Sequence, residues 1–78
     1  MSTILFLLGF RFMIYTRDHA PAHIHVHKNG KSAKIAINPV SLMENKELSG
    51  KDLKIALKIV EENKLLFQTK WIEMYGNL

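Results

Sequence analysis

The dipeptide Asn29-Gly30, with an alternating segment on each side of it, most constrains how this chain can fold. Asn-Gly between two alternating segments is typical of a two-residue type I′ turn, in which both turn residues take positive φ. The pattern therefore predicts an antiparallel hairpin of strands 23–28 and 31–37. Because the turn has a fixed length, it also fixes the register, which runs outward from Lys28 opposite Lys31.

This register sorts the side chains of the hairpin onto two chemically different faces. The apolar face carries Ile24, Val26, Ala33, Ile35 and Ile37. The histidine face carries His23, His25, His27, Ser32, Lys34 and Ala36. We expect helices to cover the apolar face, and we expect the histidine face to lie open or to meet a partner.

Two further strands are expected before the hairpin. The segments 3–7 and 10–15 are rich in strand-favouring residues and meet at Leu8-Gly9, a natural turn. A loop follows over 16–21, because Pro21 lacks an amide proton and has a fixed φ, so no helix can run through it.

Two helices are expected after the hairpin. Ser49 is a good N-cap for the first helix, and a second helix is expected over about 64–75, ending at Gly76. A single bent helix is the alternative. Phe67, Trp71 and Tyr75 are expected to anchor the core, since a small core needs large apolar side chains.

These elements predict one α+β domain over residues 1–78. It consists of an antiparallel four-stranded sheet over 3–37, a connector over 38–48, and two C-terminal helices over 49–75 packed on one face. The order is β-β-β-β-α-α.

The charge and the apolar content limit the partners and the location that the chain can have. Its net charge of +4 is compatible with RNA or another anionic partner. It contains no cysteine, which excludes disulfides and thiolate metal sites and fits a reducing cytoplasm. The apolar run 4–8 is far shorter than the ~20 residues that span a bilayer. It also lacks the flanking residues of a signal peptide, so we expect a cytoplasmic protein without membrane association.

The same apolar run predicts an association. Both faces of a strand over 4–8 would be apolar, so the strand is either buried on both sides or held against another chain. We therefore expect a homo-oligomer formed through the N-terminal strands, or a small partner protein bound there.

The order of the segments TILFLLGFRFMIY, RDHAPAHIHV and AKIAI, followed by a helix and a terminal segment with Trp71, resembles a known family. This is the bacterial family of uncharacterised small proteins called domain of unknown function 4160. The closest likeness is over residues 18–26, which resemble the family's D-H-x-P-P-H-x-H core with Ala22 in place of the second proline. The resemblance implies no assigned activity. It does imply an expectation that the protein belongs to a toxin–antitoxin-like pair.

An RNA-directed protein is the first of three functions that the residues leave open. Histidine titrates near physiological pH and can serve as acid or base at a phosphodiester. The catalytic candidates are His23, His25, His19 and Asp18. The candidate RNA contacts are Arg11, Tyr15, Arg17, Lys28 and Lys34. If the chain is an enzyme, we expect a metal-independent, ribonuclease-like activity that needs no cofactor.

A metal-binding domain is the second function. His23 and His25 point the same way from the strand, whereas His23 and His27 lie about 13 Å apart at their Cα atoms, given a rise of ~3.3 Å per residue. A workable ligand set is therefore His23 and His25 with His19 or Asp18 from the loop. Such a set leaves an open position on a divalent metal such as zinc.

An interaction module is the third function. In this interpretation the N-terminal strands dock a protein partner, and the histidines simply supply the polar side chains that an exposed sheet face requires.

Overall fold

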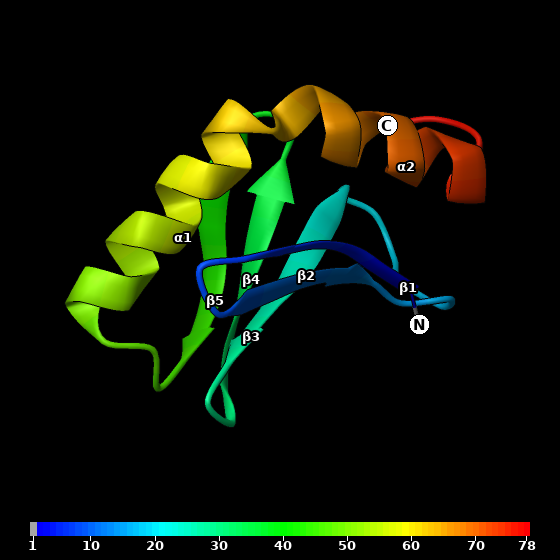
Figure 1. The fold of residues 1–78 in the computed structure, drawn as a ribbon. Helices are drawn as coiled ribbons and strands as arrows, with labels where there is room; N and C mark the ends of the chain where they lie inside the picture. The colour runs from blue at the N-terminus through cyan, green and yellow to red at the C-terminus, as the bar shows by residue number, and fades with distance from the viewer. Residues whose placement is uncertain (1) are drawn as a thin grey trace.

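The computed structural model describes residues 2–78, which form an antiparallel five-stranded sheet with two helices on it (Figure 1). The strands are β1 (Ser2–Leu7), β2 (Phe10–Ile14), β3 (His23–Lys28), β4 (Lys31–Ile37) and β5 (Val40–Lys46). The helices are α1 (Gly50–Glu62) and α2 (Lys64–Tyr75). Strand order in the sheet follows chain order. The single domain predicted over 1–78 also includes Met1, which lies outside the described residues.

The hairpin of β3 and β4 has the predicted register. The pairs run from Lys28 opposite Lys31 to His23 opposite Ala36, as the turn requires. The two turn residues, 29–30, have φ of 51° and 78°, the positive values that a type I′ turn needs. The separation of an apolar face from a histidine face is therefore built into the backbone.

The prediction of four strands is wrong, because the segment predicted as a connector contains β5. Asn38 and Pro39 form a turn, after which Val40 lies opposite Ile37 and the chain continues along the edge of β4. Nearly all side chains of β5 are exposed on both faces. The strand therefore has no alternation of apolar and polar residues that could have predicted it.

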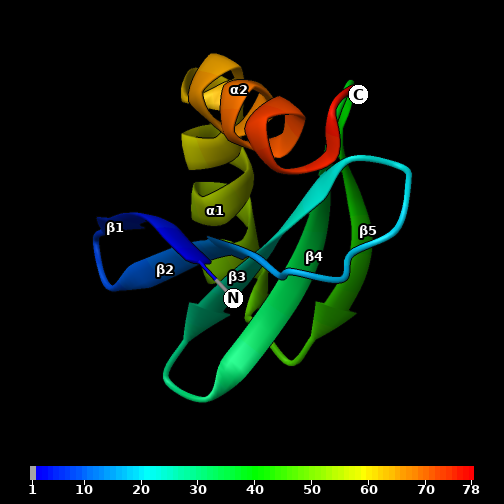
Figure 2. The same cartoon turned by 90° about the vertical axis from the view of Figure 1, so that its right-hand side faces the viewer.

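Both helices pack on the apolar face of the sheet, as predicted, and Figure 2 shows them on one side of β3, β4 and β5. Phe67 of α2 is fully buried, and its ring centroid lies 5.6 Å from that of Phe12 in β2. The core between sheet and helices consists of Phe10, Phe12, Ile14, Ala22, Ile24, Val26, Ile35, Ile37, Ala56, Ile59, Val60, Phe67 and Trp71. Removing this apolar surface from water is the main term that favours folding.

The ends of the helices have the predicted caps. Ser49 Oγ accepts a hydrogen bond from the Asp52 amide at 3.0 Å at the start of α1. The helical conformation is interrupted at Asn63, so the C-terminal segment is two helices and not one bent helix. Gly76 ends α2 with φ of 92°. Within residues 2–78, neither helix combines the length and the hydropathy needed to cross a bilayer.

The β1–β2 hairpin exposes large apolar side chains. Phe6 and Leu8 are 62% and 68% exposed, whereas Ile4 and Leu5 partly pack against the core. β1 is also an edge strand, which leaves backbone groups free to pair with another chain. Association through these strands stays a prediction.

We expect Phe67→Ala to destabilise the domain by about 3–5 kcal/mol, because it removes a fully buried ring and leaves a cavity. Leu65→Ala on the same helix is the matched control. Leu65 is 74% exposed, so the free energy of unfolding should change by no more than about 0.5 kcal/mol. Urea unfolding followed by circular dichroism measures both. Equal losses for the two variants would contradict this packing of α2.

Candidate metal centre

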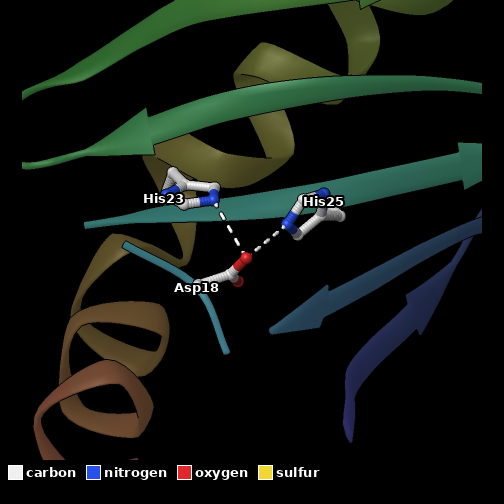
Figure 3. A group of neighbouring side chains, drawn as sticks. All are labelled: Asp18, His23 and His25. Carbon is white, nitrogen blue, oxygen red and sulfur yellow. Dashed lines mark hydrogen bonds and ion pairs between the residues drawn. The ribbon is translucent and has the colours of Figure 1, made fainter. Parts of the chain in front are cut away.

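Side chains from the loop before β3 and from β3 itself meet at one point (Figure 3). Asp18 Oδ1 lies 3.0 Å from His25 Nε2 and 3.4 Å from His23 Nε2. These three ligand atoms all lie within 4.8 Å of one another. We refer to the three residues as the Asp18–His23–His25 cluster. Over residues 2–78 it is the one group of three or more potential metal ligands that comes together in this way.

The position of Asp18 is fixed by hydrogen bonds that leave Oδ1 free to face the histidines. Its Oδ2 accepts a hydrogen bond from the Tyr15 amide at 3.0 Å. Its own amide donates to the hydroxyl of Tyr75 at 3.0 Å, and that hydroxyl donates to the Tyr15 carbonyl. The last turn of α2 therefore holds the loop that carries the carboxylate.

The tautomer of His23 is set by the loop. Its Nδ1 lies 2.8 Å from the Pro21 carbonyl, which can only accept a hydrogen bond, so Nδ1 carries the proton. In the neutral ring, Nε2 is then a bare lone pair, and it faces a carboxylate oxygen of Asp18. Two acceptors facing each other repel, and a cation between them, either a proton or a metal ion, removes the conflict.

His23 is only 5% exposed, so the expectation that the histidine face lies open is wrong at this end of β3. β2 pairs with β3 no further than Met13 opposite His25, and the start of β3 is covered by α2 instead. The ring centroid of Trp71 lies 5.4 Å from that of His23. The side chain of His25 keeps 13% of its surface exposed, so it is more accessible than His23.

His25 is held by an aromatic neighbour. Its ring stacks on Tyr15, with centroids 3.8 Å apart and an interplanar angle of 10°. The hydroxyl of Tyr15 is in turn hydrogen bonded to Nε2 of His27 at 2.9 Å. His27 is not part of the cluster, in line with its expected distance from His23.

The protonation states in the cluster suit metal binding. Burial alone would raise the pKa of Asp18, but hydrogen bonds from His25 and the Tyr15 amide, together with nearby positive charge, bring it below its ordinary value of 3.8. Burial lowers the pKa of His25 below its ordinary value of 6.5, and the attraction of Asp18 only partly opposes this. Near neutral pH the carboxylate is therefore charged and the His25 ring neutral, as metal ligands must be.

His19, the remaining catalytic or metal candidate, lies outside the cluster. Arg17 and Lys34, two of the candidate RNA contacts, lie outside it as well. His19 and Arg17 are exposed on the loop. Lys34 lies opposite His25 on β4 and forms an ion pair with Glu44 of β5 at 3.6 Å.

The remaining predicted RNA contacts lie on different faces. Arg11 is exposed, lies opposite His27 on β2, and has its guanidinium carbon 5.7 Å from the centre of the Phe6 ring. Lys28 points to the helix-covered face, where its amine is 3.2 Å from Asp52 and 4.6 Å from the centre of the Phe10 ring. Strand alternation explains this, since residue 28 has the opposite parity to the histidines.

Two contributions to the site could not have been found from local sequence patterns. Trp71 and Tyr75 were expected only as core anchors, yet Trp71 covers His23 and the Tyr75 hydroxyl fastens the loop. Both contacts join residues far apart in the chain, and no spacing rule links them.

Comparisons with known proteins agree with the sequence resemblance. The family described as Domain of unknown function (DUF4160) matches residues 9–72. The matched range contains the whole Asp18–His23–His25 cluster and Trp71, but it ends before Tyr75. Neither the curated proteins nor the solved structures contain a match to this chain. The function therefore has to be argued from the geometry of the site.

Acid should destabilise the metal-free protein in two stages. The folded pKa of His25 is lowered, so its stabilising contribution is complete above about pH 6.5 and is lost as pH falls towards the folded value. The folded pKa of Asp18 is also lowered, so the stabilising contribution of Asp18 is complete above about pH 3.8 and is lost as pH falls below that value. Tm measured against pH on dialysed, metal-free protein should show both declines. His25→Asn should lack the decline that begins near pH 6.5, and an unchanged profile would contradict this assignment.

Proposed function

The chain belongs to the family described as Domain of unknown function (DUF4160), and we propose that it is a metal-binding domain. In this proposal Asp18, His23 and His25 hold one divalent cation of the zinc class. The observation that carries the proposal is the convergence of one carboxylate oxygen and two imidazole nitrogens within 4.8 Å.

The spacing of these atoms supports a tetrahedral ion. Ligands bound to zinc at 2.0–2.2 Å with tetrahedral angles lie roughly 3.3–3.6 Å apart. The distances from Asp18 Oδ1 to the two Nε2 atoms are 3.0 Å and 3.4 Å, close to that spacing. The two Nε2 atoms lie within 4.8 Å of each other, and a tetrahedral ion would hold them at the same spacing of roughly 3.3–3.6 Å.

The surroundings of the ligands support the same proposal. Histidine ligands usually donate their other ring N–H to a carbonyl or a carboxylate, which fixes the ring and its tautomer. His23 does this with the Pro21 carbonyl, and the Tyr15 amide orients Asp18. The bare Nε2 lone pair that this leaves on His23 is the donor that a metal requires.

Three protein ligands leave one position of a tetrahedral ion open. A zinc ion held there by Asp18, His23 and His25 would supply a bound water with a pKa lowered to about 7, so a catalytic role is compatible with the site. In this proposal the rings of His23 and His25 act as ligands, and the residues left for acid–base work are Tyr15 and His27.

We expect the untagged protein to bind one equivalent of Zn²⁺ or Co²⁺, measured by elemental analysis and by competition with a chromophoric chelator. Asp18→Asn keeps the size of the side chain but removes its charge. His25→Asn removes one nitrogen ligand. Each variant should weaken binding by at least about tenfold, because changing even a residue that only orients a ligand typically costs about 10–100-fold in metal affinity.

His19→Asn is the matched control, because His19 is exposed on the same loop and lies outside the cluster. It should bind metal as tightly as the wild type. Absence of metal binding by the wild type would overturn the proposal, and so would equal losses in His19→Asn and Asp18→Asn.

RNA contact is a second candidate, favoured by the chemistry of the histidine face. Arg11, Tyr15 and Lys34 lie on or beside this face, next to His25 and His27. Cationic and aromatic side chains on a sheet face are a common platform for single-stranded RNA. Such a role is compatible with the toxin–antitoxin-like component that the family resemblance implies.

Binding of a labelled single-stranded RNA, followed by fluorescence anisotropy, should weaken steeply as salt increases. Arg11→Gln and Lys34→Gln should each weaken it severalfold. Lys28→Gln is the control, since that amine points to the opposite face and pairs with Asp52. Failure of the wild type to bind, or an equal effect of all three substitutions, would end this candidate.

A further inference from the structure

A cavity of about 220 Å³ lies beside the Asp18–His23–His25 cluster, on the side of β4 and β5. One of its walls is the ring of His25, so the cavity and the cluster share a residue. Its polar lining is completed by Tyr15, His27, Ser32, Lys34, Glu44 and Lys46.

We propose that this cavity binds a phosphate-type oxyanion, and that it does so when a metal occupies the cluster. The inference rests on the proposed metal-binding function. It adds the class of ligand that the cavity accepts, and it adds an order of binding in which the metal ion precedes the oxyanion.

The first argument is the second nitrogen of His25. Its Nε2 faces Asp18, and Figure 3 shows the other ring nitrogen on the far side of the ring, towards β4. Across the described part of the chain, that Nδ1 has no hydrogen-bond partner, unlike Nδ1 of His23. A histidine ligand normally has an acceptor at this position, and residues 2–78 do not provide one. An anion in the cavity would provide it.

Metal binding reverses the character of this nitrogen. In the metal-free protein the proton of a neutral His25 is on Nε2, where it is donated to Asp18, and Nδ1 is a lone pair that repels an anion. When Nε2 binds a metal, the proton must be on Nδ1, which becomes a donor that attracts an anion. The positive charge of the ion acts in the same direction.

The second argument is the charge of the lining. Lys34 is paired with Glu44 at 3.6 Å, so these two charges largely offset each other. Lys46 lines the same cavity and forms no ion pair with any described residue. The cavity therefore has an unopposed positive charge beside the hydroxyl of Ser32.

The third argument is the arrangement of the donors. They come from Tyr15, directly after β2, and from β3, β4 and β5, so they are spread across four neighbouring strands and do not line up along one edge. A phosphate-type oxyanion offers three or four acceptor oxygens to donors spread in this way, whereas a carboxylate offers two in one plane. The geometry therefore favours phosphate over a carboxylic acid.

The experiment is a titration of inorganic phosphate into metal-free protein and into protein loaded with Co²⁺, by calorimetry and by the visible absorption of the ion. We expect the loaded protein to bind phosphate at least about tenfold more tightly, a coupling of ~1.4 kcal/mol. Because coupling is reciprocal, phosphate should tighten Co²⁺ binding by the same factor. Equal affinity with and without metal would overturn the inference.

Charge variants test whether the cavity is the binding site. Lys46→Gln should weaken phosphate binding about threefold or more, and Glu44→Gln should strengthen it because it frees Lys34. Lys58→Gln, with the same change of charge on the exposed side of α1, is the control and should have no effect. All four proteins should bind Co²⁺ with stoichiometry one.

The outcomes separate the two proposals. If Co²⁺ binds normally but neither Lys46→Gln nor Glu44→Gln changes phosphate affinity, the cavity is not the site and only the inference fails. If the wild type binds no metal, the proposed function fails as well. Parallel titrations with a nucleoside monophosphate and a dinucleotide show whether the oxyanion is a terminal phosphate or the linkage of a nucleic acid. Tight binding of either one supports the inference.

Discussion

The structure depends on the register of the β3–β4 hairpin. That register places Ile24 and Val26 against the helices and directs His23 and His25 to the other face, where the loop carboxylate meets them. A shift of one residue would put the imidazoles into the core and the aliphatic side chains outside it, so the positions of the core and the candidate site are determined together. The turn at residues 29–30 makes the shift unfavourable, because its two positive φ values fit only one pairing.

Asp18 then joins parts of the chain that the sheet alone does not connect. Its carboxylate contacts two rings from β3, while its backbone is tied to the end of α2 through Tyr75. The side chain is only 9% exposed, so a charge at this position requires partners on several sides. The Tyr15 amide donates a hydrogen bond to Oδ2, and His25 donates one to Oδ1. Nε2 of a neutral His23 ring, in contrast, faces Oδ1 with a lone pair. A cation at that contact, either a proton on His23 or a metal ion, would remove the repulsion between the two acceptors.

Much of the fold followed from the sequence, because the relevant signals are local. Asn29-Gly30 gave the hairpin and its register, and Ser49 and Gly76 gave helix ends that the structure confirms. β5 was missed because its side chains are exposed on both faces and the strand is held by backbone pairing to β4. In the site, strand parity brought His23 and His25 together, and the choice of Asp18 over His19 needed the three-dimensional path of the loop. The burial of His23 under Trp71 depends on a helix distant in sequence, which no local pattern encodes.

The bond from Tyr75 to the loop also affects the order of events during synthesis. A nascent chain with α2 still inside the ribosome already has both imidazoles and the carboxylate. It lacks the indole that covers His23 and the hydroxyl that anchors residues 15–18. The cluster therefore reaches its final geometry only after the last turn of α2 has left the ribosome and has packed against the loop, so an ion that needs all three ligands in place is bound after that point.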